Sequence, residues 1–274
     1  MDGMFSLVRD SLRAAEPVAL ATVIELAPLD GEDVVLPPLG AKLAVRPETQ
    51  PIGSLGEPGL DVVVTRDTRG ALDAGQSVTR HYGPQGEAGR TDITVFIEVF
   101  APPPRMLIFG AVDFTAALVR VAKVLGYHVT VCDARPVFAT SMRFPEADEV
   151  VVDWPHRHLA EVAHRLGPGD AICVLTHDHK FDIPALVAAL QTRVGYIGAM
   201  GSRSTHGGRV ERLRAEGVDP DDIARIMAPI GIDIGARTPE ETAVSICAEI
   251  ISLRAGVSAP SLRDSAGPIH RVAS

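Results

Sequence analysis

Residues 105–133 read RMLIFGAVDFTAALVRVAKVLGYHVTVCD. The stretch opens with a short apolar run over 105–110 and continues with an amphipathic pattern over 113–126 that closes on Gly126. A second apolar run follows over 128–133. Short apolar strands that alternate with single helices are typical of a parallel sheet covered by helices on both faces. The stretch therefore predicts the first strand-helix-strand unit of a doubly wound α/β domain.

The same alternation continues toward the C-terminus and predicts a Rossmann-like doubly wound parallel sheet over residues 105–256. The last helix has a strong start signal, because Thr238 offers an N-cap, Pro239 fits the first helical position and Glu241 completes a capping box. We expect the strand order 3-2-1-4-5, which puts the fourth strand beside the first. Further strands are expected over 149–153, 170–175 and 194–200, and further helices near 157–166 and 183–191.

Residues 1–100 predict a smaller, β-rich (α+β) N-terminal domain. After a first amphipathic helix, segments enriched in Val, Ile and Thr are separated by Gly- and Pro-rich turns. The run Ala101-Pro102-Pro103-Pro104 cannot continue a sheet, so we place the domain boundary there. Residues 257–274 are rich in Ser, Ala, Gly and Pro and are expected to form a flexible tail. The expected strands lie over 17–26, 40–46, 61–67 and 92–100.

Composition narrows the possible partners and the compartment. Apolar residues make up 46% of the 274 residues, and the net charge is −9 without any basic run. This argues against nucleic acid and against an anionic membrane surface as partners. No apolar run reaches the ~18 residues of a membrane span. The three cysteines, Cys132, Cys173 and Cys247, lie inside apolar runs, so we expect buried free thiols and a cytoplasmic protein.

The turn after the first strand of the Rossmann-like domain keeps half of a dinucleotide-binding signature. In the pattern G-x-G-x-x-G, Gly110 holds the first position, but Val112 and Thr115 hold the other two. Asp113 is the expected N-cap and puts a carboxylate where a phosphate would meet the helix. Asp133 ends the second strand, where a ribose-binding acid is usual, with Arg135 beside it. An NAD(P)-dependent oxidoreductase is therefore an alternative that the missing glycines disfavour.

Three polar loops follow strands of the predicted sheet, over 176–182, 201–206 and 229–237. Ligands of open α/β sheets bind beyond the carboxyl ends of the strands. The first loop, THDHKFD, suits hydrogen bonding or proton transfer, although Asp178 can equally cap the following helix. A metal-dependent hydrolase built on His177, His179 and Asp182 is a further alternative.

The second loop offers hydroxyls, helix amides and an arginine to an anion, and the third is expected to be buried around Asp233. We predict a ligand crevice without a resident metal and without an assigned catalytic residue. Its cofactor-binding anchors are Gly110, Asp133, His177, Asp178, His179, Ser202, Arg203 and Asp233.

Several motifs together resemble the xanthine dehydrogenase and carbon monoxide dehydrogenase accessory protein family of XdhC and CoxI type. In the second half these are LIFGA, VLTHDHKFD, YIGAMGSRSTH and PIGIDIGARTPEETAVSICAEI, within residues 105–254. Residues 16–100 resemble the N-terminal domain of the family more faintly. The resemblance implies a cytoplasmic maturation factor, chaperone-like rather than an enzyme, with a Rossmann-type C-terminal domain. Such a factor binds molybdenum cofactor (molybdopterin) and delivers its sulfurated form to a molybdenum hydroxylase.

The chain departs from the family pattern in its N-terminal domain. The family carries two cysteine motifs there, S-G-G-C and C-G-G. Here the corresponding places read Gly56-Glu57-Pro58-Gly59 and Gly89-Arg90-Thr91-Asp92. The resemblance is therefore to a divergent member that lacks both cysteines, and any thiol-dependent step at that site is lost. Because most soluble oligomers are symmetric, we also expect a homodimer.

Overall fold

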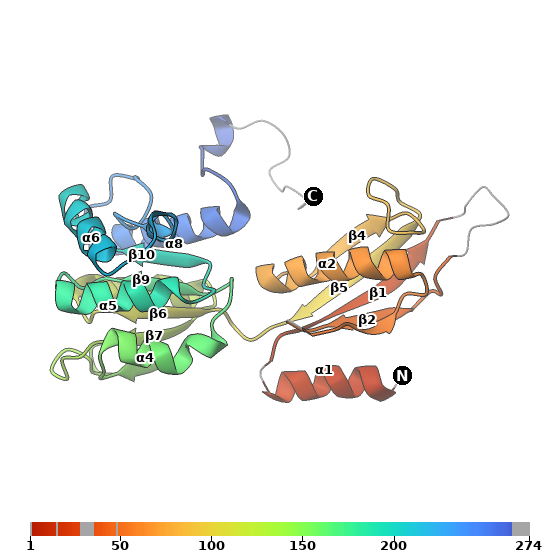
Figure 1. Cartoon of the computed structure of the whole chain (residues 1–274), viewed down its shortest axis with the longest axis horizontal. Helices are drawn as coiled ribbons and strands as arrows, with labels where there is room; N and C mark the ends of the chain where they lie inside the picture. Colours follow the sequence, from red (N-terminus) through yellow and green to blue (C-terminus); the bar gives the residue numbers. More distant parts are fainter. Residues whose placement is uncertain (1, 15, 28–35, 48, 265–274) are drawn as a thin grey trace. The chain divides into compact units, whose positions relative to one another are not determined.

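The computed structural model describes residues 2–14, 16–27, 36–47 and 49–264. It divides into two compact units, Met1–Pro103 and Pro104–Ser274, and the point of division lies in the proline run of the sequence (Figure 1). Each unit has its own hydrophobic core. Of the segment predicted as a tail, residues 265–274 lie outside the described residues. The remainder includes a short 3-10 helix, Leu262–Asp264.

The first unit is built on a five-stranded antiparallel sheet with the order β3-β2-β1-β5-β4. The central strand β1 places Leu20 opposite Ala44 on one neighbour and opposite Glu98 on the other. Its buried residues Ala19, Ala21 and Val23 alternate with less buried ones, as expected for a sheet covered on one face. The strands are β1 (Val18–Leu26), β2 (Lys42–Val45), β3 (Ile52–Ser54), β4 (Val78–Tyr82) and β5 (Ile93–Phe100).

A helix, α2 (Pro58–Ala74), occupies the place where we predicted a strand over 61–67, so that prediction was wrong. Pro58 stands at the first helical position, and Gly75 ends the helix in the left-handed conformation with φ 64°. Leu60, Val64, Ala71 and Leu72 are buried, at helical rather than alternating spacing. They pack on the sheet and override the strand preference of the Val run.

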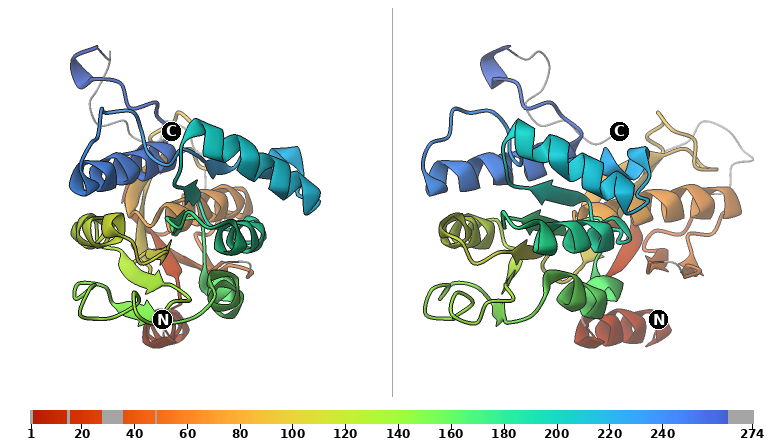
Figure 2. Two further views of the ribbon diagram at one scale, coloured as in Figure 1. Left: turned by 90° about the vertical axis from the view of Figure 1, so that its left-hand side faces the viewer. Right: turned by 60° about the vertical axis from the view of Figure 1, so that its left-hand side comes forward.

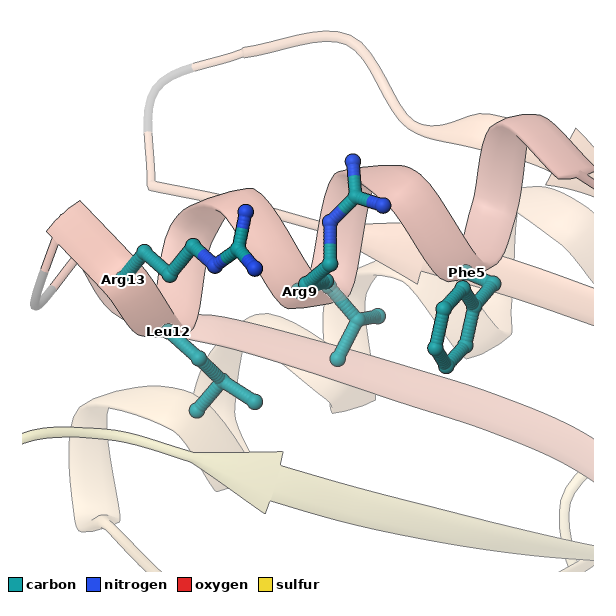
Figure 3. A pocket seen from close by; sticks show the side chains of 5 residues that line it. Phe5, Arg9, Leu12 and Arg13 are labelled. Carbon is teal, nitrogen blue, oxygen red and sulfur yellow. The ribbon is translucent and has the colours of Figure 1, made fainter.

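Helix α1 (Asp2–Ala14) contacts β1 and carries an apolar surface on its exposed side. Figure 3 shows Phe5, Arg9, Leu12 and Arg13 around a hollow of about 360 Å³. The Phe5 and Leu12 side chains are 70% and 53% exposed. None of the predicted site residues lines this hollow.

The second unit contains a six-stranded parallel sheet with the order β11-β10-β9-β6-β7-β8. Numbered within the unit, this is the order 3-2-1-4-5-6, which confirms the predicted placement of the fourth strand beside the first. The Rossmann-like fold class is therefore confirmed. The strands are β6 (Arg105–Phe109), β7 (His128–Cys132), β8 (Glu149–Val151), β9 (Ala171–Val174), β10 (Tyr196–Ala199) and β11 (Ile226–Met227).

Helices cover both faces of this sheet, as Figure 2 shows. Helices α3 (Asp113–Val124) and α8 (Pro239–Ala255) pack together on one face. Met106 and Ile108 point into the core on that face, whereas Leu107 and Phe109 point into the other. Burying such a side chain stabilises the fold by roughly 1.5–3 kcal/mol. The second core lies under α4 (Pro155–Val162), α5 (His179–Leu190), α6 (Arg203–Ala215) and the short α7 (Pro220–Ile223).

Candidate functional site

The predicted anchors all follow strands of the parallel sheet at its carboxyl edge. Gly110 follows β6, Asp133 follows β7, and the histidine loop follows β9. Ser202 and Arg203 follow β10, and Asp233 follows β11. Since these strands are parallel, their carboxyl ends meet at one edge of the sheet. The edge therefore brings the anchors into one region, where they form three groups.

Gly110 and Asp133 form the first group. Gly110 has φ +115°, and a Cβ atom there would lie 2.9 Å from the backbone nitrogen of Thr176, so only glycine fits. The Asp133 carboxylate is 2% exposed and accepts hydrogen bonds from the Ala111 amide at 2.8 Å and from the Arg135 amide at 2.9 Å. The Arg135 guanidinium adds a bidentate pair at 2.9 and 2.7 Å. Asp133 thus ties the Gly110 turn to the β7 loop.

The amides of this turn are already hydrogen-bonded within the chain. Gly110 donates to the Cys132 carbonyl at 2.9 Å, and Val112 donates to the Thr115 hydroxyl at 3.3 Å. In dinucleotide-binding proteins, amides of this turn face the pyrophosphate and the acid after the second strand binds ribose. Here Asp133 and the amides have protein partners instead. Helix α3 begins at Asp113 and its N-cap position is Val112, so the prediction of Asp113 as N-cap was wrong.

His177, Asp178 and His179 form the second group, at the end of β9. His177 and Asp178 are exposed, and Asp178 is the N-cap of α5 because its carboxylate accepts from the Lys180 amide at 3.1 Å. This bond and an ion pair with the Lys180 ammonium hold the pKa of Asp178 below its usual value. His179 is the first helical residue, and its Nδ1 atom is buried. The capping alternative for Asp178 is therefore confirmed.

A buried ion pair lies behind this loop. Asp182 on α5 and Arg209 on α6 are 1% and 0% exposed, and Arg209 Nη2 lies 3.2 Å from Asp182 Oδ2. Arg209 also donates to the Met200 carbonyl at 2.8 Å, while the Thr176 hydroxyl donates to Asp182. Burial raises the pKa of Asp182 against the opposing effect of these bonds. The pair joins the carboxyl ends of β9 and β10 through their following helices.

Ser202, Arg203 and Asp233 form the third group, and the structure places them in one pocket of about 590 Å³. The Ser202 hydroxyl caps α6 by accepting from the Thr205 amide at 3.1 Å, and Arg203 is exposed in the first turn. Asp233 accepts from the Gly235 amide at 3.3 Å. Residues 233–238 are exposed, so the prediction of a buried loop was wrong. Ser204, Pro229, Gly231 and Ile232 complete the pocket lining.

Hydrogen-bond donors dominate this pocket on the α6 side. The first helical turn directs backbone amides and a positive dipole end outward, and Arg203 adds a guanidinium. A volume of this size suits a small molecule. The arrangement favours a ligand with an anionic group, and the carboxylate of Asp233, which also lines the pocket, suits a hydrogen-bond donor of the same ligand.

Sequence reasoning missed Arg209 and Arg143 at this edge. Arg209 lies in the segment GGRVERLR, whose many charged residues are typical of a solvent-exposed helix face. Nothing in the sequence indicates that Arg209 is buried. Arg143 lies in the β7–β8 loop outside any motif, yet its guanidinium donates to the Ala111 carbonyl at 3.2 Å. Long-range partners that converge on a residue only in the fold leave no local signal.

The three cysteines are buried, as predicted. Burial raises the pKa of Cys132 and Cys247 to about 12 and that of Cys173 well above its usual value. Among the residues that the structure describes, no group of three or more His, Cys, Asp or Glu side chains is arranged to hold a metal ion. Within the same residues, every helix is too short or too polar to cross a lipid bilayer.

Comparison with known proteins gives matches along most of the chain. The family model described as the XdhC Rossmann domain matches residues 106–250, and the one described as the XdhC and CoxI family matches residues 11–83. A protein of Bacillus subtilis, named as a probable subunit of xanthine dehydrogenase, is 36% identical over 160 residues, which are 58% of this chain and 46% of that protein.

The molybdenum cofactor insertion chaperone PaoD of Escherichia coli is 28% identical over 155 residues, 57% of this chain and 42% of PaoD. The chain thus spans less than half the length of these curated relatives. A crystal structure described as a xanthine dehydrogenase from Bacillus halodurans aligns with 92% of this chain and 97% of its own, at 20% identity and a TM-score of 0.49.

Proposed function

Because the chain belongs to the XdhC and CoxI family, we propose that it is an accessory factor for a molybdenum hydroxylase of the xanthine dehydrogenase or carbon monoxide dehydrogenase type. It binds molybdenum cofactor or the client enzyme during cofactor insertion and does not itself turn over a substrate. The relative named as a molybdenum cofactor insertion chaperone supports this role. The acidic composition fits a protein or small-molecule partner rather than nucleic acid.

The observation that carries the proposal is the pocket formed by Ser202, Arg203 and Asp233. Molybdopterin bears a phosphate, and the donors of the α6 first turn together with Arg203 suit that group. No thiol is available there to bind the metal end of the cofactor, since all three cysteines are buried elsewhere in the fold. When bound, the cofactor supplies the dithiolene and the metal, and this chain supplies the hold on its anionic end.

Two measurements test this role. Mass spectrometry of ligand released from natively purified protein should detect molybdopterin or its nucleotide form. A client apoenzyme of the xanthine dehydrogenase type should gain activity faster when this chain is added with free cofactor than when cofactor is added alone. Protein that neither retains the cofactor nor associates with a molybdenum hydroxylase would contradict the proposal.

Replacement of Arg203 tests the pocket itself. Arg203→Ala should weaken cofactor binding by about 1.5–3 kcal/mol, because a hydrogen bond to a charged group is lost. Arg214→Ala is the matched control, since Arg214 is exposed at the opposite end of the same helix. If both variants bound like the wild type in calorimetry, the pocket would not hold the anionic group.

The structure gives a physical reason to rank an NAD(P)-dependent oxidoreductase below this role. A ribose or pyrophosphate at the Gly110 turn would have to displace the hydrogen bonds from Ala111 and Arg135 to Asp133. Calorimetry should therefore detect no NADH or NADPH binding at concentrations up to about 50 µM, an affinity near −6 kcal/mol. Tighter binding would favour the oxidoreductase.

A further inference from the structure

Cationic and aromatic side chains cluster at the carboxyl edge of β7 and β9, apart from the pocket beside α6. Arg135 lies 4.6 Å above the ring of Phe138 and 6.0 Å from that of Phe181. The Arg143 guanidinium also lies over the Phe138 ring, at 5.6 Å, and the Lys180 ammonium lies 4.8 Å from the centre of the Phe181 ring. Three cations therefore converge on two rings. Cation–π contacts at this range are attractive and hold the guanidinium planes against the rings.

Two of the three cations, Arg135 and Arg143, are held in place by hydrogen bonds within the protein. The Arg135 guanidinium is held bidentately by Asp133, which is 2% exposed and also bonded to the Ala111 amide. Arg143 Nη1 donates to the carbonyls of Ala111 and Phe138, both at 3.2 Å. Phe138 nevertheless stays 40% exposed. An aromatic residue packed against two guanidinium groups is therefore accessible to solvent.

Two of the three cations, Arg143 and Lys180, form weak ion pairs with exposed carboxylates that a ligand anion can replace. Arg143 approaches the Asp113 carboxylate only at 3.9 Å, and the side chain of Asp113 is 94% exposed. The Lys180–Asp178 pair, at 3.1 Å, joins side chains that are 60% and 50% exposed. Exposed pairs of this kind change an equilibrium by no more than about fivefold. A ligand anion can therefore replace either carboxylate at small cost, whereas Asp133 stays paired with Arg135.

We propose that this cluster binds a planar heteroaromatic ring that carries an anionic group, with the ring stacked on Phe138 and the Arg135 guanidinium and the anion held by Arg143 or Lys180. A pterin phosphate and a nucleoside monophosphate share this chemistry. The ring supplies the stacking surface, and the two exchangeable cations supply the charge. If the ring is a pterin, the site rests on the function proposed above and is an alternative to the pocket beside α6 for the anionic end of the cofactor. If the ring is a nucleobase, the site is independent of that function.

Trp154 is the only tryptophan of the chain and reports directly on this site. Its ring centroid lies 5.0 Å from that of Phe181, which in turn lies under Arg135 and Lys180. A ring that stacks at the cluster should therefore change the fluorescence of Trp154. The signal comes from one place in the molecule and needs no label.

The experiment titrates the whole protein with four probes and follows Trp154 fluorescence and calorimetric heat together. Pterin-6-carboxylate and GMP each combine a ring with an anion, 6-hydroxymethylpterin offers the ring alone, and inorganic phosphate offers the anion alone. N-acetyltryptophanamide corrects for light absorbed by the probes. We expect saturable quenching by pterin-6-carboxylate, by GMP or by both, and weaker binding of the two partial probes. The more tightly bound ring identifies the ligand type.

Two variants assign the signal to the cluster. Phe138→Ala should weaken binding by about 5- to 100-fold, because one stacking surface is lost. Val137→Ala is its control, as a 79% exposed neighbour in the same loop. Lys180→Gln should weaken the anionic probes and leave 6-hydroxymethylpterin unchanged. Lys42→Gln, in the first unit, is the control for removing a lysine.

Three results would overturn the proposal. Phosphate alone could change the signal as much as the ring compounds do. Phe138→Ala could bind like the wild type while its circular dichroism shows an intact fold. Finally, calorimetric heat without any change in Trp154 fluorescence would place the ligand elsewhere, and the absence of both signals would exclude binding. These titrations contain neither molybdenum cofactor nor a client enzyme, so their failure would leave the accessory role to its own tests.

Discussion

At the scale of single residues, Asp133 joins more of the carboxyl edge than any other anchor. Burial opposes its ionisation, but the bonds from Arg135 and from the amides of Ala111 and Arg135 outweigh that effect and hold the pKa of Asp133 below its usual value. A carboxyl group with a lowered folded-state pKa stabilises the fold above its unfolded pKa of about 4. That contribution is lost as the pH falls through the folded-state pKa.

Asp133→Asn should therefore destabilise the protein at neutral pH by about 1.5–3 kcal/mol, the range for hydrogen bonds to a charged group. Urea unfolding at a series of pH values measures this difference. The difference in unfolding free energy between wild type and variant should become smaller below about pH 4. Asp113→Asn, at a 94% exposed side chain in the first turn of α3, should change stability by less than about 1 kcal/mol. An Asp133→Asn gap that stayed constant down to about pH 2 would contradict the assigned role of its charge.

The buried pair of Asp182 and Arg209 makes a second prediction at this scale. Arg209→Met leaves the Asp182 carboxyl buried without its cation, which should cost about 3–5 kcal/mol. Asp182→Leu combined with Arg209→Met removes both charges, so the double variant should be more stable than the sum of the single losses predicts. Urea unfolding of the wild type, the two single variants and the double variant completes this double-mutant cycle. Strict additivity would show that the two groups do not interact.

The sequence identified where Asp133 lies but not what it contacts, and it did not identify Arg209. Asp133 was expected at the end of the second strand, because an acid after that strand is a local feature. Its partners Ala111 and Arg135 depend on how the Gly110 turn folds back, which is a tertiary feature. Arg209 shows the stronger limit, since a buried arginine on a helix of charged residues has no local pattern.

At the scale of elements, the start of α8 is the best-specified local structure in the chain. The Thr238 hydroxyl accepts from the Glu241 amide at 3.1 Å, and the Glu241 carboxylate accepts from the Thr238 amide at 3.0 Å. This reciprocal capping box follows directly from Thr238-Pro239-Glu240-Glu241, as predicted. It anchors the helix that follows the pocket loop with Asp233.

Thr238→Ala should destabilise the protein by about 1 kcal/mol through loss of this cap. Glu240→Ala is the matched control, because it removes only an exposed ion pair with Arg120 from the same turn. Thermal unfolding compares the two variants. Equal losses would mean that the cap adds nothing beyond ordinary surface contacts.

Elements were predicted well where periodicity and caps agreed and poorly where they conflicted. Five of the six strands of the parallel sheet were predicted within a few residues, since each is a short apolar run between turns, whereas the two-residue strand β11 was not predicted. Helix α5 begins at His179 rather than near 183, because Asp178 caps it early and Pro184 lies inside it. The segment DVVVTRD looks like a strand from composition, yet the flanking Pro58 and Gly75 mark a helix.

At the scale of the whole molecule, the two units have separate cores. The core of Met1–Pro103 contains residues of the antiparallel sheet and α2, and those of Pro104–Ser274 contain residues of the parallel sheet and its helices. The domain assignment of 1–100 and 105–256 remains a prediction about independent folding. A domain with a complete core of its own is expected to fold alone.

A fragment of residues 104–274 should therefore unfold in one cooperative urea transition. Because the only tryptophan, Trp154, belongs to this unit, its fluorescence should follow the same midpoint in the fragment and in the full chain. A fragment without a cooperative transition would show that the second unit needs the first.

The burial of all three thiols has a consequence for any sulfur chemistry around this protein. A thiol that stays protonated inside a core cannot carry a persulfide from a donor protein to an acceptor. If the cofactor is sulfurated while this chain holds it, the sulfur atom must pass directly from the donor protein to the cofactor. This chain would then hold the cofactor without carrying the sulfur atom itself. Iodoacetamide should accordingly modify no cysteine in the native protein and all three after denaturation, as mass spectrometry would count.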